Sequence, residues 1–102
     1  KDKNFNVSEY AKKVFGMFAG EMVRANLTFK NFLLDAVMDK FGTDIIPHKV
    51  DDEHFSVSRE VSMSPTFYAW MFQFGVNAKI TAPDRLIDAY KDYIKTVLSA
   101  MD

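Results

Sequence analysis

Two histidines and a run of acidic residues lie close together in the middle of the chain, where they could bind a divalent metal. His48 and His54 flank Asp51–Glu53, and imidazole and carboxylate groups are common zinc ligands. The spacing matches no helical histidine pair and no metalloprotease motif. A solvated hairpin turn accounts for the same residues, and we therefore predict no metal site and no cofactor.

Covalent and phosphate chemistry find little support in the sequence. The chain has no cysteine, which excludes disulfides and thiolate metal sites. It also lacks a G-x-S-x-G turn and a glycine-rich phosphate loop. Hydrolysis of an acyl phosphate would use an arginine beside an asparagine. Arg24 and Asn26 lie two residues apart and match this pattern only weakly. We predict that the chain is not an enzyme.

Composition narrows the class of protein further. The 102 residues are enough for one domain with one core, and 48% of them are hydrophobic, including ten phenylalanines. A formal net charge of -1 argues against direct binding of nucleic acid. No apolar run is long enough to span a bilayer. These features predict a cytoplasmic protein without membrane contact, and the start at Lys1 predicts a piece of a longer protein.

Hydrophobic periodicity divides the chain into alternating helices and strands. Strands are predicted at 23–30, 55–63 and 76–82, where apolar and polar residues alternate. A shorter strand, Ile45–Val50, is interrupted by Pro47 and therefore belongs at a sheet edge. Helices are predicted at 31–41 and 65–74, and a long one follows Pro83. Asn6, with Glu9 as its capping-box partner, begins an amphipathic N-terminal helix that ends before Gly20.

This order predicts an α+β fold. From residue 22 onward the elements follow the ferredoxin-like split βαβ pattern, β-α-β-β-α-β, with a four-stranded antiparallel sheet and a long C-terminal helix. Right-handed crossovers place the first and third strands in the middle. Residues 1–21 are predicted to form a helix and linker from a missing upstream domain, and residues 22–102 to form the folded domain.

One face of the predicted sheet is polar and offers the best candidates for ligand binding. It carries two cations, one carboxylate and several hydroxyl and amide groups, a mixture suited to a small polar ligand. The ligand-binding candidates on this face are Arg24, Asn26, Ser58, Glu60 and Lys79. The competing interpretation is an ordinary solvated face, or one that contacts a neighbouring domain, with Arg24 and Glu60 paired to each other.

Arg59 is a further candidate because it occupies an apolar position of its strand. A buried unpaired charge is too costly to persist. Three alternatives remain: a bulge turns Arg59 outward, its long side chain reaches the rim, or the guanidinium is buried beside an acid. A functional contact with an anion competes with the rim and bulge alternatives.

The helix 65–74 carries more apolar surface than one core face can use. Ser64 and Pro65 are a typical helix start, and Gly75 a typical helix end. Phe67, Trp70, Met71 and Phe74 share one arc of the helix and are predicted to be core. Tyr68 and Phe72 lie on a separate flank, which predicts either an interface with a partner or a surface covered by the N-terminal helix.

The run Phe55–Tyr93 resembles the C-terminal extension, or WCX domain, of bacterial WYL-domain transcriptional regulators. The resemblance rests on an aromatic helix with Trp70 that ends at Phe74-Gly75, a short strand, and Ala82–Leu86 opening the last helix. Residues 4–30 are similar to the linker and first strand of such proteins. The resemblance implies that Trp70, Gly75, Pro83 and Leu86 define the fold and that no catalytic residue is present.

The resemblance also implies a function. In such regulators a winged helix-turn-helix binds DNA, and the extension contributes to dimer contacts or to signal transmission. We therefore predict a regulatory domain that forms a homodimer or contacts an upstream WYL domain, acts on DNA only indirectly, and has a small molecule or nucleotide as a further candidate partner. The alternative is a stand-alone ferredoxin-like module that binds a small ligand.

Overall fold

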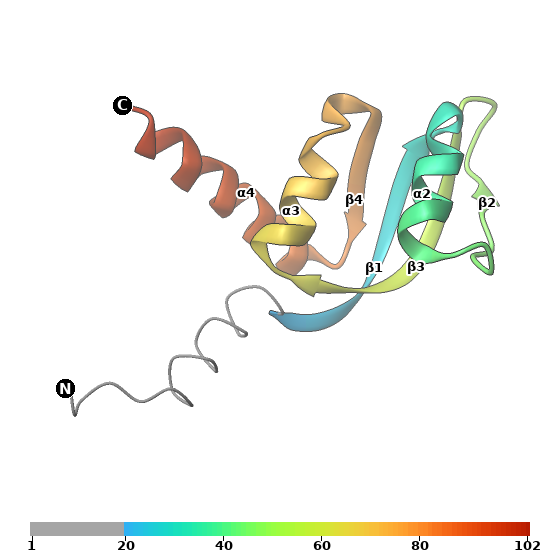
Figure 1. The fold of residues 1–102 in the computed structure, drawn as a ribbon, viewed down its shortest axis with the longest axis horizontal. Helices are drawn as coiled ribbons and strands as arrows, with labels where there is room; N and C mark the ends of the chain where they lie inside the picture. The colour runs from blue at the N-terminus through green and yellow to red at the C-terminus, as the bar shows by residue number, and fades with distance from the viewer. Residues whose placement is uncertain (1–19) are drawn as a thin grey trace.

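The computed structural model describes residues 20–102, so the predicted N-terminal helix lies outside the described residues. The described part is an α+β fold with a four-stranded sheet (Figure 1). Its elements are β1 (Glu21–Lys30), η2 (Asn31–Leu33), α2 (Leu34–Phe41), β2 (His48–Lys49), β3 (His54–Met63), α3 (Pro65–Phe72), η3 (Gly75–Asn77), β4 (Ala78–Ala82) and α4 (Asp84–Ala100). None of the helices between residues 20 and 102 combines the length and apolar character that crossing a membrane requires.

The sheet is antiparallel throughout, with the strand order β2-β3-β1-β4. The prediction that the first and third strands lie in the middle is confirmed. β1 and β3 pair over their full length, from Glu21 opposite Met63 to Lys30 opposite His54. The edge strands β2 and β4 are much shorter.

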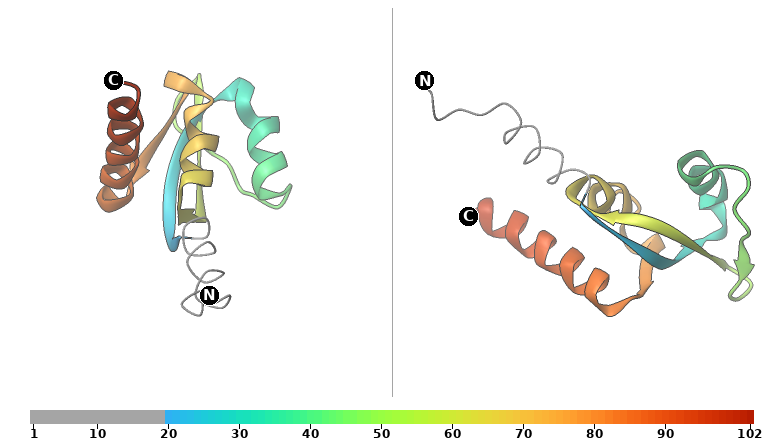
Figure 2. Two further views of the ribbon diagram at one scale, coloured as in Figure 1. Left: turned by 60° about the vertical axis from the view of Figure 1, so that its left-hand side comes forward. Right: turned by 90° about the horizontal axis from the view of Figure 1, so that it is seen from below.

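Alternation along β1 separates a core face from a solvated face. Ala25, Leu27 and Phe29 are completely buried, while Arg24 and Asn26, which point to the other face, are exposed. Both α2 and α3 lie on the face that these apolar side chains occupy (Figure 2). Phe29 lies at the centre, stacked on Phe55 and packed edge-on against Trp70 and Phe74. Helix-covered apolar area of this kind is the main source of stability in a domain of this size.

The start of α3 is as predicted, but its end is earlier. The buried Ser64 caps the helix by accepting the amide of Phe67, and Pro65 occupies the first turn. The helix stops at Phe72 rather than at Phe74. Gly75 has φ +58° and begins the turn η3, so β4 starts at Ala78 rather than at Val76. Residues 76 and 77 continue the apolar–polar alternation of the strand in the sequence, but in the structure they belong to the turn η3.

Two further boundaries differ from the prediction. Of the predicted strand Ile45–Val50, only His48 and Lys49 pair with β3, because Pro47 lacks the N–H that an earlier pairing would need. β2 does lie at the sheet edge, as predicted. The segment 31–41 begins as the short 3-10 turn η2 before α2 continues it to Phe41.

The long helix α4 leaves the edge strand β4 and runs past α3, so that its last turns project beyond the other elements (Figure 1). Leu86 in its first turn is fully buried. Tyr90 and Tyr93 pack on Tyr68 of α3, with ring centroids 5.6 and 5.2 Å from that of Tyr68. The stripe that anchors α4 therefore ends near Tyr93, although the helix continues for two more turns.

Candidate functional site

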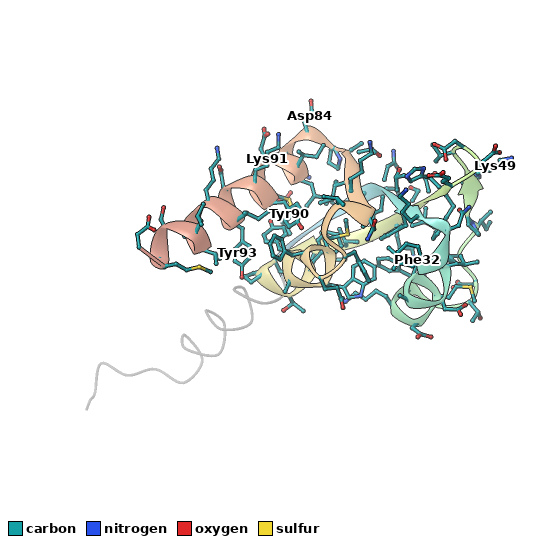
Figure 3. The ribbon with its side chains drawn as sticks, turned by 90° about the horizontal axis from the view of Figure 1, so that it is seen from above. Phe32, Lys49, Asp84, Tyr90, Lys91 and Tyr93 are labelled. Carbon is teal, nitrogen blue, oxygen red and sulfur yellow. The ribbon has the colours of Figure 1, made fainter. Side chains whose placement is uncertain are left out.

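An apolar groove of about 470 Å³ lies between α3 and α4. Tyr90 and Tyr93 project into this region from α4 (Figure 3). Both helices contribute side chains to the groove, and most of these side chains are apolar or aromatic. The lining residues are Ala69, Phe72, Gln73, Tyr90, Tyr93, Ile94, Val97, Leu98 and Met101.

The two interface candidates of α3 occupy different places in relation to this groove. Tyr68 is only 6% exposed because Tyr90 and Tyr93 cover it. Burial raises the pKa of Tyr68 and the pKa of Tyr90. Phe72 is 61% exposed and forms one rim of the groove. The aromatic flank of α3 is thus divided between an intramolecular contact and an open rim.

The opposite rim is formed by the last two turns of α4. Leu98 and Met101 are largely exposed there, and Gln73 is the lining residue with a polar amide. Among residues 20–102, the side chains that line the groove are uncharged. An apolar groove between two helices is suited to the apolar face of a third helix.

The polar sheet face brings five of the six ligand-binding candidates together. Arg24 lies opposite Glu60, and Asn26 lies opposite Ser58, across the β1–β3 pair. Lys79 of β4 lies opposite Thr28 on the same face. Two of these positions already bond to the sheet: Nη1 of Arg24 is 3.4 Å from the Ser58 carbonyl oxygen, and the Asn26 carbonyl accepts the Thr81 hydroxyl at 3.1 Å.

Arg59 lies apart from these five, on the face covered by the helices. The β1–β3 register passes through Arg59 opposite Ala25 without a bulge, so the bulge alternative is wrong. Nη2 of Arg59 donates to the Phe41 carbonyl oxygen at 2.7 Å and lies 3.6 Å from the Asp44 carboxylate. The side chain is 35% exposed. It reaches the rim of the core and caps the C-terminal end of α2, where a cation is favoured.

Replacement of Arg59 by methionine is expected to lower the free energy of unfolding by about 1–2 kcal/mol, because the last carbonyl of α2 loses a charged donor. The midpoint of urea unfolding measures this loss. Arg24→Met is the matched control, since Arg24 is exposed and its bond is long. Equal effects of the two substitutions would show that capping of α2 by Arg59 is unimportant.

The hairpin between β2 and β3 is held by its own polar groups. Asp51 Oδ1 lies 2.7 Å from His54 Nδ1 and accepts the Glu53 amide at 2.8 Å. The hydrogen bond with His54, followed by the one from the Glu53 amide, lowers the pKa of the Asp51 carboxyl. Lys30 pairs with Glu53 nearby. Within residues 20–102, no three histidine or carboxylate side chains gather as a metal site would require.

Acid is expected to weaken the wild-type hairpin more than that of Asp51→Asn. Because folding lowers the pKa of Asp51, its contribution to stability is complete above the unfolded value of 3.8 and is lost as the pH falls through the folded value. The melting temperature of the wild type should therefore fall more steeply below about pH 4. Parallel curves for the two proteins would contradict the role of the Asp51–His54 contact.

Sequence patterns missed the α4 side of the groove. Tyr90 and Val97 belong to an apolar stripe along the last helix in the sequence, but neither they nor Tyr93 are predicted as site residues. The available signal was the length of that stripe, since α4 extends for 17 residues beside a five-residue strand. Because the apolar stripe of α4 is much longer than β4, part of it must pack against other elements or remain exposed.

No protein-family model matches the chain, and no curated protein matches it either.

Proposed function

We propose that the chain is a non-catalytic regulatory and interaction domain, the WCX-like C-terminal part of a WYL-type transcriptional regulator. In this proposal it makes dimer or interdomain contacts through the groove between α3 and α4. The element order β-α-β-β-α-β and the strand order β2-β3-β1-β4 support a ferredoxin-like split βαβ fold. Any effect on DNA is indirect, through a helix-turn-helix domain elsewhere in the regulator.

The observation that carries the proposal is the apolar groove and its exposed rims. Phe72 lies on one side, and Leu98 and Met101 on the other. Large apolar side chains that gather around a hollow mark contact surfaces more often than isolated exposed ones do. The described lining of the groove offers mainly apolar packing surface and carries no charge, which suits an assembly role better than catalysis.

The packing of the landmark residues is compatible with the resemblance. Trp70 packs edge-on against Phe41 and Phe74, and Leu86 is completely buried. Gly75 adopts a positive φ at the turn that follows α3. These positions have structural roles in the described fold, as the proposed family assignment requires.

A second candidate function is a stand-alone module that binds a small polar ligand on the open sheet face. The observation that favours it is the cluster of exposed groups around Arg24 opposite Glu60 and Asn26 opposite Ser58. In either case the ligand or partner must prefer one arrangement of the protein over another in order to transmit a signal.

The solution mass of the chain, measured by light scattering over a range of concentrations, tests the dimer contact. Phe72→Ser is compared with Phe32→Ser, because Phe32 is also exposed, at 72%, but lies on η2, outside the groove. A dimer that dissociates only in Phe72→Ser supports a dimer contact at the groove. A dimer that persists in Phe72→Ser rules out a dimer contact at the groove. If the wild type is a monomer, the dimer contact is ruled out and only the interdomain contact of the proposal remains.

A further inference from the structure

We propose that the groove between α3 and α4 is occupied by residues 6–18 of the same chain, as an amphipathic helix antiparallel to α4. This inference rests on the interdomain form of the proposed function, because it assumes that the groove is a contact surface. It names as the occupant the segment that is predicted to link the domain to an upstream domain, in place of a second copy of the chain. Three observations support this occupant over others: where the segment joins the domain, how long it is, and which side chains it carries.

The segment joins the domain at the point where both helices of the groove begin. Glu21 lies opposite Met63, which directly precedes the capping residue of α3. The Glu21 carboxylate also pairs with Arg85 in the first turn of α4, at 2.5 Å. A Cβ on Gly20 would lie 2.2 Å from the Met63 carbonyl oxygen, and Gly20 has φ +64°. Glycine is therefore required there, and its backbone permits a sharp change of chain direction.

The lengths agree. Along α4, Tyr90 lies about 7.5 Å beyond Arg85, and the groove continues for about 16 Å to Met101 at 1.5 Å per residue. A helix over residues 6–18 is about 18 Å long. Residues 19 and 20 span up to about 7 Å, enough to reach the Tyr90 end of the groove. The antiparallel direction then places Phe18 near Tyr90 and Val7 near Met101.

The side chains of the segment suit the groove. Its apolar residues recur at helical spacing and form one stripe, which is composed of Val7, Tyr10, Ala11, Val14 and Phe18. Residues 1–19 contain four lysines and two acidic residues, which gives a net charge of +2. Because the whole chain has a net charge of -1, residues 20–102 have a net charge of -3. Opposite net charges favour association of the two parts.

A second copy of the chain is the main competing occupant. It would cover the groove but leave the apolar stripe of residues 6–18 without a partner surface. The tether at Gly20 also keeps the segment at an effective concentration of about a millimolar or more, which an independent chain reaches only at high protein concentration. The same argument disfavours an unrelated apolar peptide.

Disulfide trapping tests the proposal in the full chain, which has no cysteine of its own. Ala11→Cys is combined with Leu98→Cys, which lines the groove, or with Ser99→Cys, which lies on the opposite side of α4. Under mild oxidation at micromolar protein, the first pair should form an intramolecular disulfide at least tenfold faster than the second. Equal rates, or disulfides that only join two chains, would overturn the proposal.

Hydrogen–deuterium exchange provides a second readout that needs no cysteine. Amides of residues 94–101 should exchange about tenfold faster in Val14→Ser/Phe18→Ser than in the wild type. Lys12→Ser/Lys13→Ser is the matched control and should leave the exchange rates unchanged. Unchanged exchange in the apolar variant would show that residues 6–18 do not cover α4.

The outcomes also separate this inference from the proposed function. Disulfides between two chains at Leu98→Cys, together with a dimer that Phe72→Ser dissociates, would overturn the intramolecular occupant and retain the groove as a contact surface. The proposed function itself fails if the wild type is a dimer that survives Phe72→Ser and exchange over residues 94–101 is unaffected by Val14→Ser/Phe18→Ser.

Discussion

Phe29→Ala is expected to lower the free energy of unfolding by about 3–5 kcal/mol and to leave the domain only marginally folded. Phe29 is completely buried and touches the rings of Phe55, Trp70 and Phe74. Its removal leaves a cavity between the sheet and α3 that these rings fill only in part. The midpoint of urea unfolding, followed by Trp70 fluorescence and by circular dichroism, measures the loss.

Phe32→Ala is the control for this substitution. Phe32 lies three residues further along the chain but is 72% exposed, so its truncation should change the free energy of unfolding by no more than about 0.5 kcal/mol. Similar losses for the two variants would mean that Phe29 is not the centre of the core.

Leu86→Ala is expected to cost about 2–5 kcal/mol and to loosen the attachment of α4. Leu86 is the only residue of α4 that is fully buried, and it lies in the first turn, directly after β4. Without it, α4 is attached mainly by the packing of Tyr90 and Tyr93 on Tyr68. Thermal unfolding measures the loss of stability, and hydrogen exchange along α4 measures its release.

Val76→Ala is the matched control, because Val76 is an apolar residue in the turn before β4 and is almost fully exposed. Its unfolding midpoint should stay close to that of the wild type. If Leu86→Ala melts like the control, α4 is held by contacts other than its first turn.

The sequence predicted the strands well because their alternation follows directly from a sheet with one buried face. Ala25, Leu27 and Phe29 are buried as their period requires. Boundaries were less predictable, since they depend on single local events. Pro47 reduces β2 to two residues, and the turn at Gly75 removes two residues from the start of β4.

Part of the candidate site depends on tertiary contacts that a helical wheel cannot contain. Tyr68 lies on a flank of α3 away from the sheet, and the wheel gives no reason for it to be buried. It is buried because α4 brings Tyr90 and Tyr93 against it. The position of Arg59 was likewise ambiguous in sequence, since the carbonyl that it binds belongs to Phe41, 18 residues earlier.

The short edge strand β2 has a consequence for association through the main chain. β2 pairs only with Phe55 and Ser56 of β3. Among residues 20–102, the rest of the outer edge of β3 therefore has no paired strand. Exposed strand edges recruit other chains unless charges or twists discourage them. On this edge Arg59 points to one face and Glu60 to the other, and charged side chains at an open edge are among the features that discourage edge-to-edge pairing.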